Sequence, residues 1–325
     1  MSYGMDVNVG LSFQNSYGTA LVNSIYWLPL LSEGISLKKE PIKAEGMRGI
    51  YDEGASYEGQ NMIEGDITNE IDARLFGAMC KAFFGSPVTS TTGVSSGVLY
   101  THTFKPAQDD FDLYAAKIPL TITKVMDDAG SAHRYYDMQA SKLSINIANG
   151  QLVKATLGLL GGKYAQVAAP TATYSASALF PFDVASASLG GTAKPEVREL
   201  NIEADDSLEN IYTLSGAKTP SRTKRSGFRT IQISGTLVFD TQTEYQQFLS
   251  QSERELVVSL TGSTQVQSGF YETITFKTPL ARHAEFEMVG DGPGKVEASF
   301  TMDAKYSVTS GTALQAIVAN GLAAY

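Results

Sequence analysis

Few residues of this chain have the types and spacing that chemistry requires. The segment Gly93-Val94-Ser95-Ser96-Gly97 matches the Gly-x-Ser-x-Gly motif of serine hydrolases, whose serine stands on a sharp turn between a strand and a helix. Here a stretch rich in Ser and Thr precedes the motif, and residues 98–104 after it are expected to form a strand. The strand-turn-helix context is missing, so we assign no nucleophile to this segment.

Phosphate and metal sites lack their defining spacing as well. Residues 158–163 (GLLGGK) are glycine-rich, but Tyr164 stands where a phosphate-binding loop carries a Ser or Thr for magnesium. With Cys80 as its one cysteine, the chain has no disulfide framework and no thiolate cluster. The histidines are not spaced as zinc ligands, and the aspartate pairs are not spaced as the oxygen ligands of an EF-hand. These residues are His102, His133, His283, Asp109-Asp110, Asp127-Asp128 and Asp205-Asp206. We predict no enzyme, no cofactor and no metal.

Composition narrows the partners further. Lys and Arg total 25 and Asp and Glu total 34, which gives a net charge of −9. This acidity excludes a protein held on nucleic acid by a general basic surface, because phosphate binding needs Lys and Arg. The longest apolar run, near residues 26–31, is too short to span a bilayer, and no secretory signal follows Met1. We therefore expect a protein that is made and folded in a cytoplasm.

Alternation of apolar and polar residues dominates the chain and predicts strands with one buried and one wet face. In residues 63–71, Ile63, Ile67 and Ile71 point to one side and polar residues to the other, and residues 231–239 repeat the pattern. Asn149-Gly150 predicts a hairpin turn that needs positive φ at both positions, and 290–294 (GDGPG) predicts a looser turn. Further strands are predicted at 112–125, 133–148, 151–161, 199–204, 210–214, 255–261, 271–278, 285–289 and 296–306.

Two segments have helical spacing instead. Residues 72–84 carry a continuous apolar stripe, with Asp72 as N-cap and Gly85-Ser86-Pro87 as the stop. Residues 241–252 place Tyr245, Phe248 and Leu249 on one face, and Thr241 with Glu244 has the spacing of a capping box. Each helix directly follows one of the two matching strands.

This recurrence indicates an internal repeat. In each half a strand leads into a helix, and the last hairpin ends in Lys-Tyr, at Lys163-Tyr164 and at Lys305-Tyr306. Residues 165–195 between the halves are rich in Ala, Ser, Thr and Pro, as a linker would be. We predict a mainly β protein of two domains, 1–166 and 167–325, in which 167–195 is the linker-like start of the second.

Short motifs also follow one another in a characteristic order along nearly the whole chain. The first half holds Ser16-Tyr17-Gly18-Thr19, 28–37 (LPLLSEGISL), Gly59-Gln60 before Glu64-Gly65-Asp66-Ile67, Phe83-Phe84-Gly85 and 100–104 (YTHTF). The second half holds 180–184 (FPFDV), 208–214 (LENIYTL) and 233–237 (ISGTL) before its helix. This order resembles that of phage tail tube proteins, the major tail proteins of tailed bacteriophages.

The resemblance implies two tandem β-sandwich tail-tube-like domains, each with one flanking α-helix. In that family the inner sheets line up around a six-fold axis into one closed β-barrel, and the rings stack into a tube through which DNA leaves the capsid. Two domains per chain imply a trimeric ring with pseudo-six-fold symmetry. The implied partners are further copies of this chain, the tape measure protein inside the tube, the tail terminator, distal tail or baseplate proteins, and DNA that passes without adhering. The expected location is the virion tail, after assembly in the host cytoplasm.

Acidic residues on the predicted strands suit such a conduit. Carboxylates at the lumen would repel phosphate, over the ~8–10 Å that screening allows, and the alternative is an ordinary solvated sheet face. The predicted lumen-facing residues are Glu64, Asp66, Glu70, Glu285 and Glu287.

Two loops at equivalent places in the repeat carry opposite charge. Residues 215–229 form a basic loop with Lys218, Arg222, Lys224, Arg225 and Arg229, and residues 45–60 form an acidic loop with Glu45, Asp52, Glu53 and Glu58. We expect the basic loop to reach an acidic surface on the next ring or a neighbouring chain, where it would steer assembly and fix register. Reversing the charge of Arg222, Lys224 and Arg225 together is expected to stop polymerisation.

Other functions remain open from the residues alone. A tail terminator, a baseplate hub or a contractile-tail tube protein could use the same module, and a secreted carbohydrate-binding β-sandwich is a more distant alternative. Such a lectin displays aromatic residues on a concave face, whereas Trp27 lies within an apolar strand. The segment 307–325 would dock on a neighbouring chain or cover its own domain, and we favour the neighbour.

Overall fold

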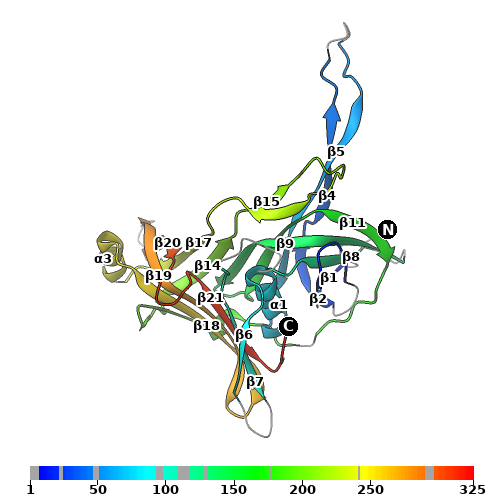
Figure 1. Ribbon diagram of the computed structural model, residues 1–325. Helices are drawn as coiled ribbons and strands as arrows, with labels where there is room; N and C mark the ends of the chain where they lie inside the picture. Colours follow the sequence, from blue (N-terminus) through cyan, green and yellow to red (C-terminus); the bar gives the residue numbers. More distant parts are fainter. Residues whose placement is uncertain are drawn as a thin grey trace.

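The alternating segments form antiparallel sheets that make up most of the molecule (Figure 1). The computed structural model describes residues 7–325 except 22–24, 47–50, 93–97, 109–116, 127–129, 176, 241 and 290–295. Strands dominate the described residues, and two α-helices, α1 (Ala73–Phe84) and α3 (Thr243–Ser250), lie among them with one short 3-10 turn, η2 (Phe182–Val184). The prediction of a mainly β fold with one α-helix in each half is confirmed.

The first half has two sheets that share a long strand, β9 (Ser131–Ala148). The first part of β9 belongs to a sheet with β2 (Tyr26–Leu28), β1 (Asn8–Phe13), β8 (Leu120–Val125) and β11 (Lys163–Ala168). Its last part belongs to a second sheet with β10 (Lys154–Gly161), β5 (Ser56–Glu70), β3 (Leu30–Glu33) and β4 (Ser36–Lys43). The β4–β5 hairpin extends beyond the sheet as an arm (Figure 1).

The second half is built around an equally long strand, β19 (Phe270–Val289). Its last part pairs with β20 (Glu297–Lys305), which continues through β17 (Thr230–Val238) to β14 (Val197–Asp205). Its first part pairs with β18 (Arg254–Gln267) and β21 (Gln315–Asn320), and these lead to β12 (Ala185–Leu189), β13 (Thr192–Ala193), β7 (Leu99–Phe104) and β6 (Val88–Thr92). A separate hairpin joins β15 (Leu208–Ile211) to β16 (Arg222–Arg225).

Strand pairing shows that the two halves repeat one topology. Both long strands even carry a bulge at the same place, since the registers of β9 with β10 and of β19 with β20 shift at Ser141 and Ala284. The elements of the two halves correspond in their order along the chain and in their pairing partners. The matched elements are β1 with β12, β2 with β13, β5 with β17, α1 with α3, β8 with β18, β9 with β19, β10 with β20 and β11 with β21, and β3 and β4 together match β14.

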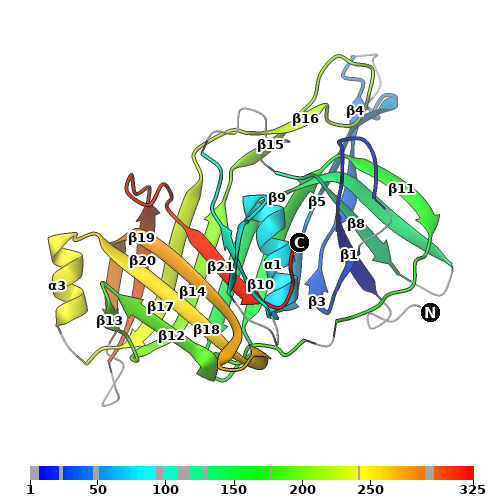
Figure 2. The same cartoon turned by 60° about the horizontal axis from the view of Figure 1, so that its bottom comes forward.

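The halves are joined edge to edge by strand pairing. β14 of the second half pairs antiparallel with the last part of β9, from Glu199 opposite Ala148 to Asp205 opposite Lys142. One continuous sheet therefore runs from β4 through β5, β10, β9, β14, β17 and β20 to β19 (Figure 2). This joint satisfies backbone groups that each half alone would leave unpaired.

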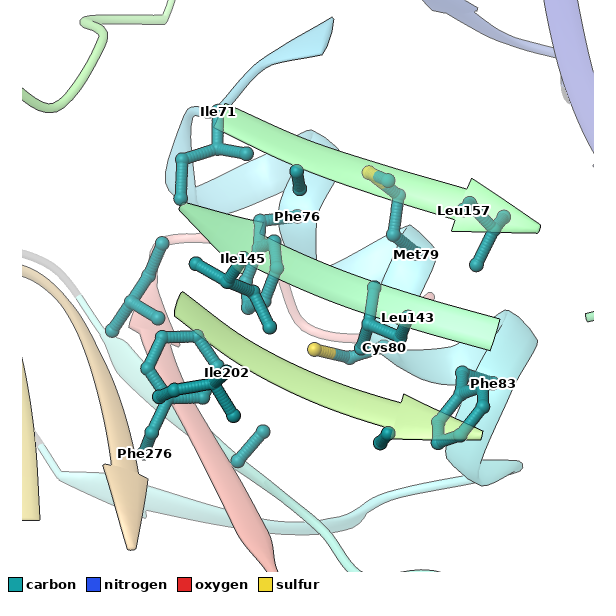
Figure 3. Packing of buried hydrophobic residues seen from close by; sticks show 14 of the residues in the cluster. Ile71, Phe76, Met79, Cys80, Phe83, Leu143, Ile145, Leu157, Ile202 and Phe276 are labelled. Carbon is teal, nitrogen blue, oxygen red and sulfur yellow. The ribbon is translucent and has the colours of Figure 1, made fainter. Parts of the chain in front are cut away.

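Helix α1 packs on the apolar face of that sheet, as its stripe predicts (Figure 3). The Asp72 carboxylate caps the helix by accepting hydrogen bonds from the backbone N–H groups of Arg74 and Leu75, both at 2.8 Å. Phe76 meets Phe276 of the second half edge to face, with ring centres 5.4 Å apart. Helix α1 thus contributes to the core of both halves.

Helix α3 differs from its prediction. It begins at Thr243, and its N-cap Gln242 makes no side-chain hydrogen bond; Thr241 lies outside the described residues. Glu244 binds Lys194, and the predicted capping box includes Thr241 and therefore falls outside the described residues. Leu249, predicted on the apolar face, is 55% exposed, so that part of the prediction is wrong.

Several strand predictions need correction. Residues 271–278 and 285–289 are one strand, β19, because the bulge near Ala284 interrupts the alternation without ending the pairing. The strand predicted from 112 begins at Leu120, and residues 109–116 lie outside the described part. Gly150 has a positive φ of 79°, but Asn149 does not share it, so the turn is not the predicted two-residue type. The predicted turn at 290–294 also lies outside the described residues.

The segment 307–325 covers its own chain, which is one of the two alternatives, and its contact with a neighbouring chain stays a prediction. β21 pairs with β7 of the first half. The Tyr325 hydroxyl and the Asn320 amide both donate to the Ala73 carbonyl at 3.0 Å, at the start of α1. Gly77 provides the room for this ring, because a Cβ there would lie 1.9 Å from the Tyr325 hydroxyl oxygen.

A buried charge cluster also joins the halves, just beyond β14. The Asp206 carboxylate is fully buried and binds Lys117, Arg225 and Arg229. Burial lowers the pKa of Lys117 to about 8, although the charge of Asp206 opposes the shift. Burial raises the pKa of Asp206, but the cations around it outweigh this effect and hold that pKa below its ordinary value. The cluster therefore depends on a single carboxylate.

Replacing Asp206 with Asn should lower the free energy of unfolding by about 3–5 kcal/mol, because it leaves buried cations without their carboxylate. Denaturant titration at pH 7 measures the loss. Since the pKa of Asp206 is lowered in the fold, its stabilisation is present above the ordinary value of 3.8 and is lost as the pH falls through the folded value. The difference from the native chain should therefore narrow in acid. The exposed control Glu209→Gln should change little, and an equal loss in both variants would contradict the role of the cluster.

Candidate assembly surfaces

The continuous sheet has one apolar and one acidic face. Its apolar face forms the core, with residues such as Ile67, Leu157 and Ile202 fully buried. The other face collects the alternate residues of β5, β9, β14, β17, β20 and β19, and acidic side chains outnumber basic ones on it. The acidic residues are Glu64, Asp66, Glu70, Glu199, Glu203, Asp205, Glu285, Glu287, Glu297 and Asp303.

Electrostatics on this face reflect the surplus of carboxylates. Lys142 binds Glu203 at 2.7 Å across the joint between the halves. This hydrogen bond raises the pKa of Lys142, and the nearby charges of Asp205 and Asp66 add to the effect. The face brings together all five acids predicted for a lumen surface, although they come from strands far apart in the sequence.

The acidic loop lies on the arm formed by β4 and β5. Lys43 binds Glu53 at 2.8 Å along the arm, and Glu45 and Asp52 are exposed near its tip. Glu58 binds Lys39 at 3.3 Å and also binds Lys218 of the basic loop. The hydrogen bond from Lys218 lowers the pKa of Glu58, with Lys39 adding to the shift. The two loops that the sequence sets at equivalent positions thus meet within one chain.

The charges of the basic loop fall into three groups. Arg225 and Arg229 turn inward to the buried Asp206, and Lys218 reaches the arm. Arg222 and Lys224 on β16 are exposed. Reversing Arg225, as the sequence suggests, would therefore disturb the buried cluster as well as the surface, so Arg222 and Lys224 are the residues with which to test an outside contact.

Two sheet edges have no strand beside them among the described residues. The last part of β19 pairs with β20 on one side, and β3 with β4 pairs only with β5. Met288 on the β19 edge is 41% exposed, and Phe286 beside it is partly exposed. Sequence reasoning missed these edges because it assigned no neighbour to either strand; the repeat, read strand by strand, is the signal that could have found them.

The sequence motifs for chemistry find no support in the described residues. The Ser95 segment lies outside them. His102 contacts Thr89 and the Leu322 carbonyl, and His133 contacts the Tyr164 hydroxyl. Within the described part of the chain, no group of three or more His, Cys, Asp and Glu side chains could hold a metal, and no helix is long and apolar enough to cross a membrane.

Comparison with known proteins identifies the family of this chain. The search of curated proteins found no match. A protein-family model described as phage tail tube protein matches residues 4–304, which is nearly the whole chain. The chain therefore belongs to the phage tail tube protein family and is a structural component of the phage tail.

Proposed function

We propose that the protein polymerises as stacked rings into the hollow tail tube through which DNA passes to the host. The observation that carries the proposal is the joint between β9 and β14, which links two repeated modules edge to edge and leaves corresponding edges at the two ends of one sheet. Heterologous edges of this kind form rings when the rotation closes. Three chains would supply six modules around the axis.

The acidic sheet face is the proposed wall of the lumen. A surface on which carboxylates outnumber lysines repels the phosphates of DNA and offers them few partners. The tape measure protein would occupy this lumen before DNA passes, and a tail terminator and distal tail or baseplate proteins would meet the two ends. Assembly would take place in the host cytoplasm and the product would be part of the virion tail.

Electron microscopy of the concentrated, purified protein tests this function. We expect long hollow tubes, and a reconstruction should place Asp66 and Glu287 at the inner surface. Discrete rings that never stack would instead indicate a terminator or hub built on the same module. Monomers at all concentrations would contradict self-assembly. A carbohydrate-binding role fits less well, since Trp27 is 5% exposed and lies in the core.

We further propose that Arg222 and Lys224 contact an acidic surface of the next ring, for which Glu45 and Asp52 on the arm are the candidates. The variant Arg222→Glu with Lys224→Glu should form rings but few tubes, measured by sedimentation and microscopy, because surface charge steers assembly. The charge-conserving variant Arg222→Lys with Lys224→Arg is the matched control and should form tubes.

Adding Glu45→Lys and Asp52→Lys to the reversed variant should restore tubes in part. Since the contact is exposed, high salt should weaken stacking of the native rings. Normal tubes from the reversed variant would contradict the proposed contact between rings. The proposal that the chain forms rings would still stand.

A further inference from the structure

We infer that the free edge of β19 pairs with the free β3–β4 edge of a second copy in the register of the internal joint, with Glu285 opposite Lys38. The inference rests on the proposed ring and adds the residues that close it. It follows from transferring the observed joint between β9 and β14 to the equivalent strands, one pair at a time.

The residues of β9 in the internal joint have counterparts on β19. Leu143 of β9 lies opposite Leu157 of β10, and Phe286 of β19 lies opposite Phe300 of β20. Both pairs lie two residues from the bulge of the long strand, so Phe286 is the counterpart of Leu143. By the same count Glu285 corresponds to Lys142 and Met288 to Ile145.

The residues of β14 in the internal joint have counterparts on β4 and just before it. Ile67 of β5 lies opposite Leu157, and Gly235 of β17 lies opposite Phe300, so Ile63 and Ile231 are equivalent. Their other neighbours are Leu37 on β4 and Ala204 on β14. Lys38 therefore corresponds to Asp205, Ser36 to Glu203 and Ile35 to Ile202.

The two free edges fit together in the register of the internal joint. In the internal joint Leu143 lies opposite Ala204, Ile145 opposite Ile202 and Lys142 opposite Asp205. The transferred register places Phe286 opposite Leu37, Met288 opposite Ile35 and Glu285 opposite Lys38 of the second copy. The four apolar residues just named in the internal joint are each at most 1% exposed, whereas Met288 is 41% exposed. A second copy would cover the apolar surface that this edge leaves open.

Charge supports the same register. The internal joint sets a lysine on β9 against an aspartate on β14, and the transferred joint sets a glutamate on β19 against a lysine on β4. The sign is reversed between the two joints. If β19 paired with β14 of another copy, Glu285 would lie opposite Asp205, and if β9 paired with β4, Lys142 would lie opposite Lys38. Like charges directly opposite each other destabilise a strand pair. The charges therefore favour alternation of the internal and external joints around a ring.

Charge exchange tests the pairing directly. Glu285→Lys and Lys38→Glu should each raise the protein concentration needed for ring formation at least tenfold, and the double exchange should bring it back to within about threefold of native, as analytical ultracentrifugation would show. Glu199→Lys makes the same charge change on the same face, on β14 between β9 and β17 and so away from both free edges, and should leave ring formation unaltered. Thermal unfolding verifies that every variant is folded.

Cysteine pairs test the register to one residue. Glu287→Cys combined with Ser36→Cys should give covalent trimers on oxidation, because directly opposite Cα atoms lie within disulfide range. Glu287→Cys combined with Lys39→Cys is out of register and should give none. The native Cys80 is buried and serves as a silent background.

The outcomes separate the two proposals. If the native chain forms rings but neither charge exchange nor the matched cysteines behave as expected, this register is overturned and the tube function stands. If the native chain forms no rings at all, both the function and this pairing are contradicted.

Discussion

Unpaired backbone groups at sheet edges are the constraint on which the rest of this structure depends. Each half is a module whose sheet ends at edge strands. These strands present rows of N–H and C=O groups that need partners. Pairing of β14 with β9 removes two such edges inside the chain and makes one sheet of two modules. The same operation leaves one open edge at β19 and another at β3–β4. A chain built in this way is suited to being joined by copies of itself.

Strand alternation connects that architecture with its charge. Buried residues such as Ile202 and Leu157 lie on one face of the sheet, and the residues next to them along each strand lie on the other face. Many of these neighbouring residues are acidic. Because the sheet is continuous across both halves, the acidic residues of both halves lie on one face. The polar face is thus a consequence of core formation. Because acidic residues outnumber basic ones on it, this face repels phosphate, as the wall of a DNA conduit would need to.

Ionic contacts act at three levels of burial. Asp206 with its cations is dry and holds the halves together, so its loss would be costly. Lys142 with Glu203 lies across a strand joint at the wet face, where it contributes register more than stability. Arg222 and Lys224 are exposed and are available to a partner. Charged residues of the same types therefore stabilise the fold, set strand register or face a partner, according to their exposure.

The sequence by itself determined the mainly β class, the repeat and helix α1, because alternation, the Asp72 cap and the apolar stripe are local signals. It also identified the family, through the order of its motifs. Only the tertiary structure decided that β14 joins β9, that 307–325 covers the chain's own α1, and that Arg225 turns inward. Strand and ion-pair partners come from distant parts of the chain, so they depend on which edges and buried charges remain once the sheets have formed.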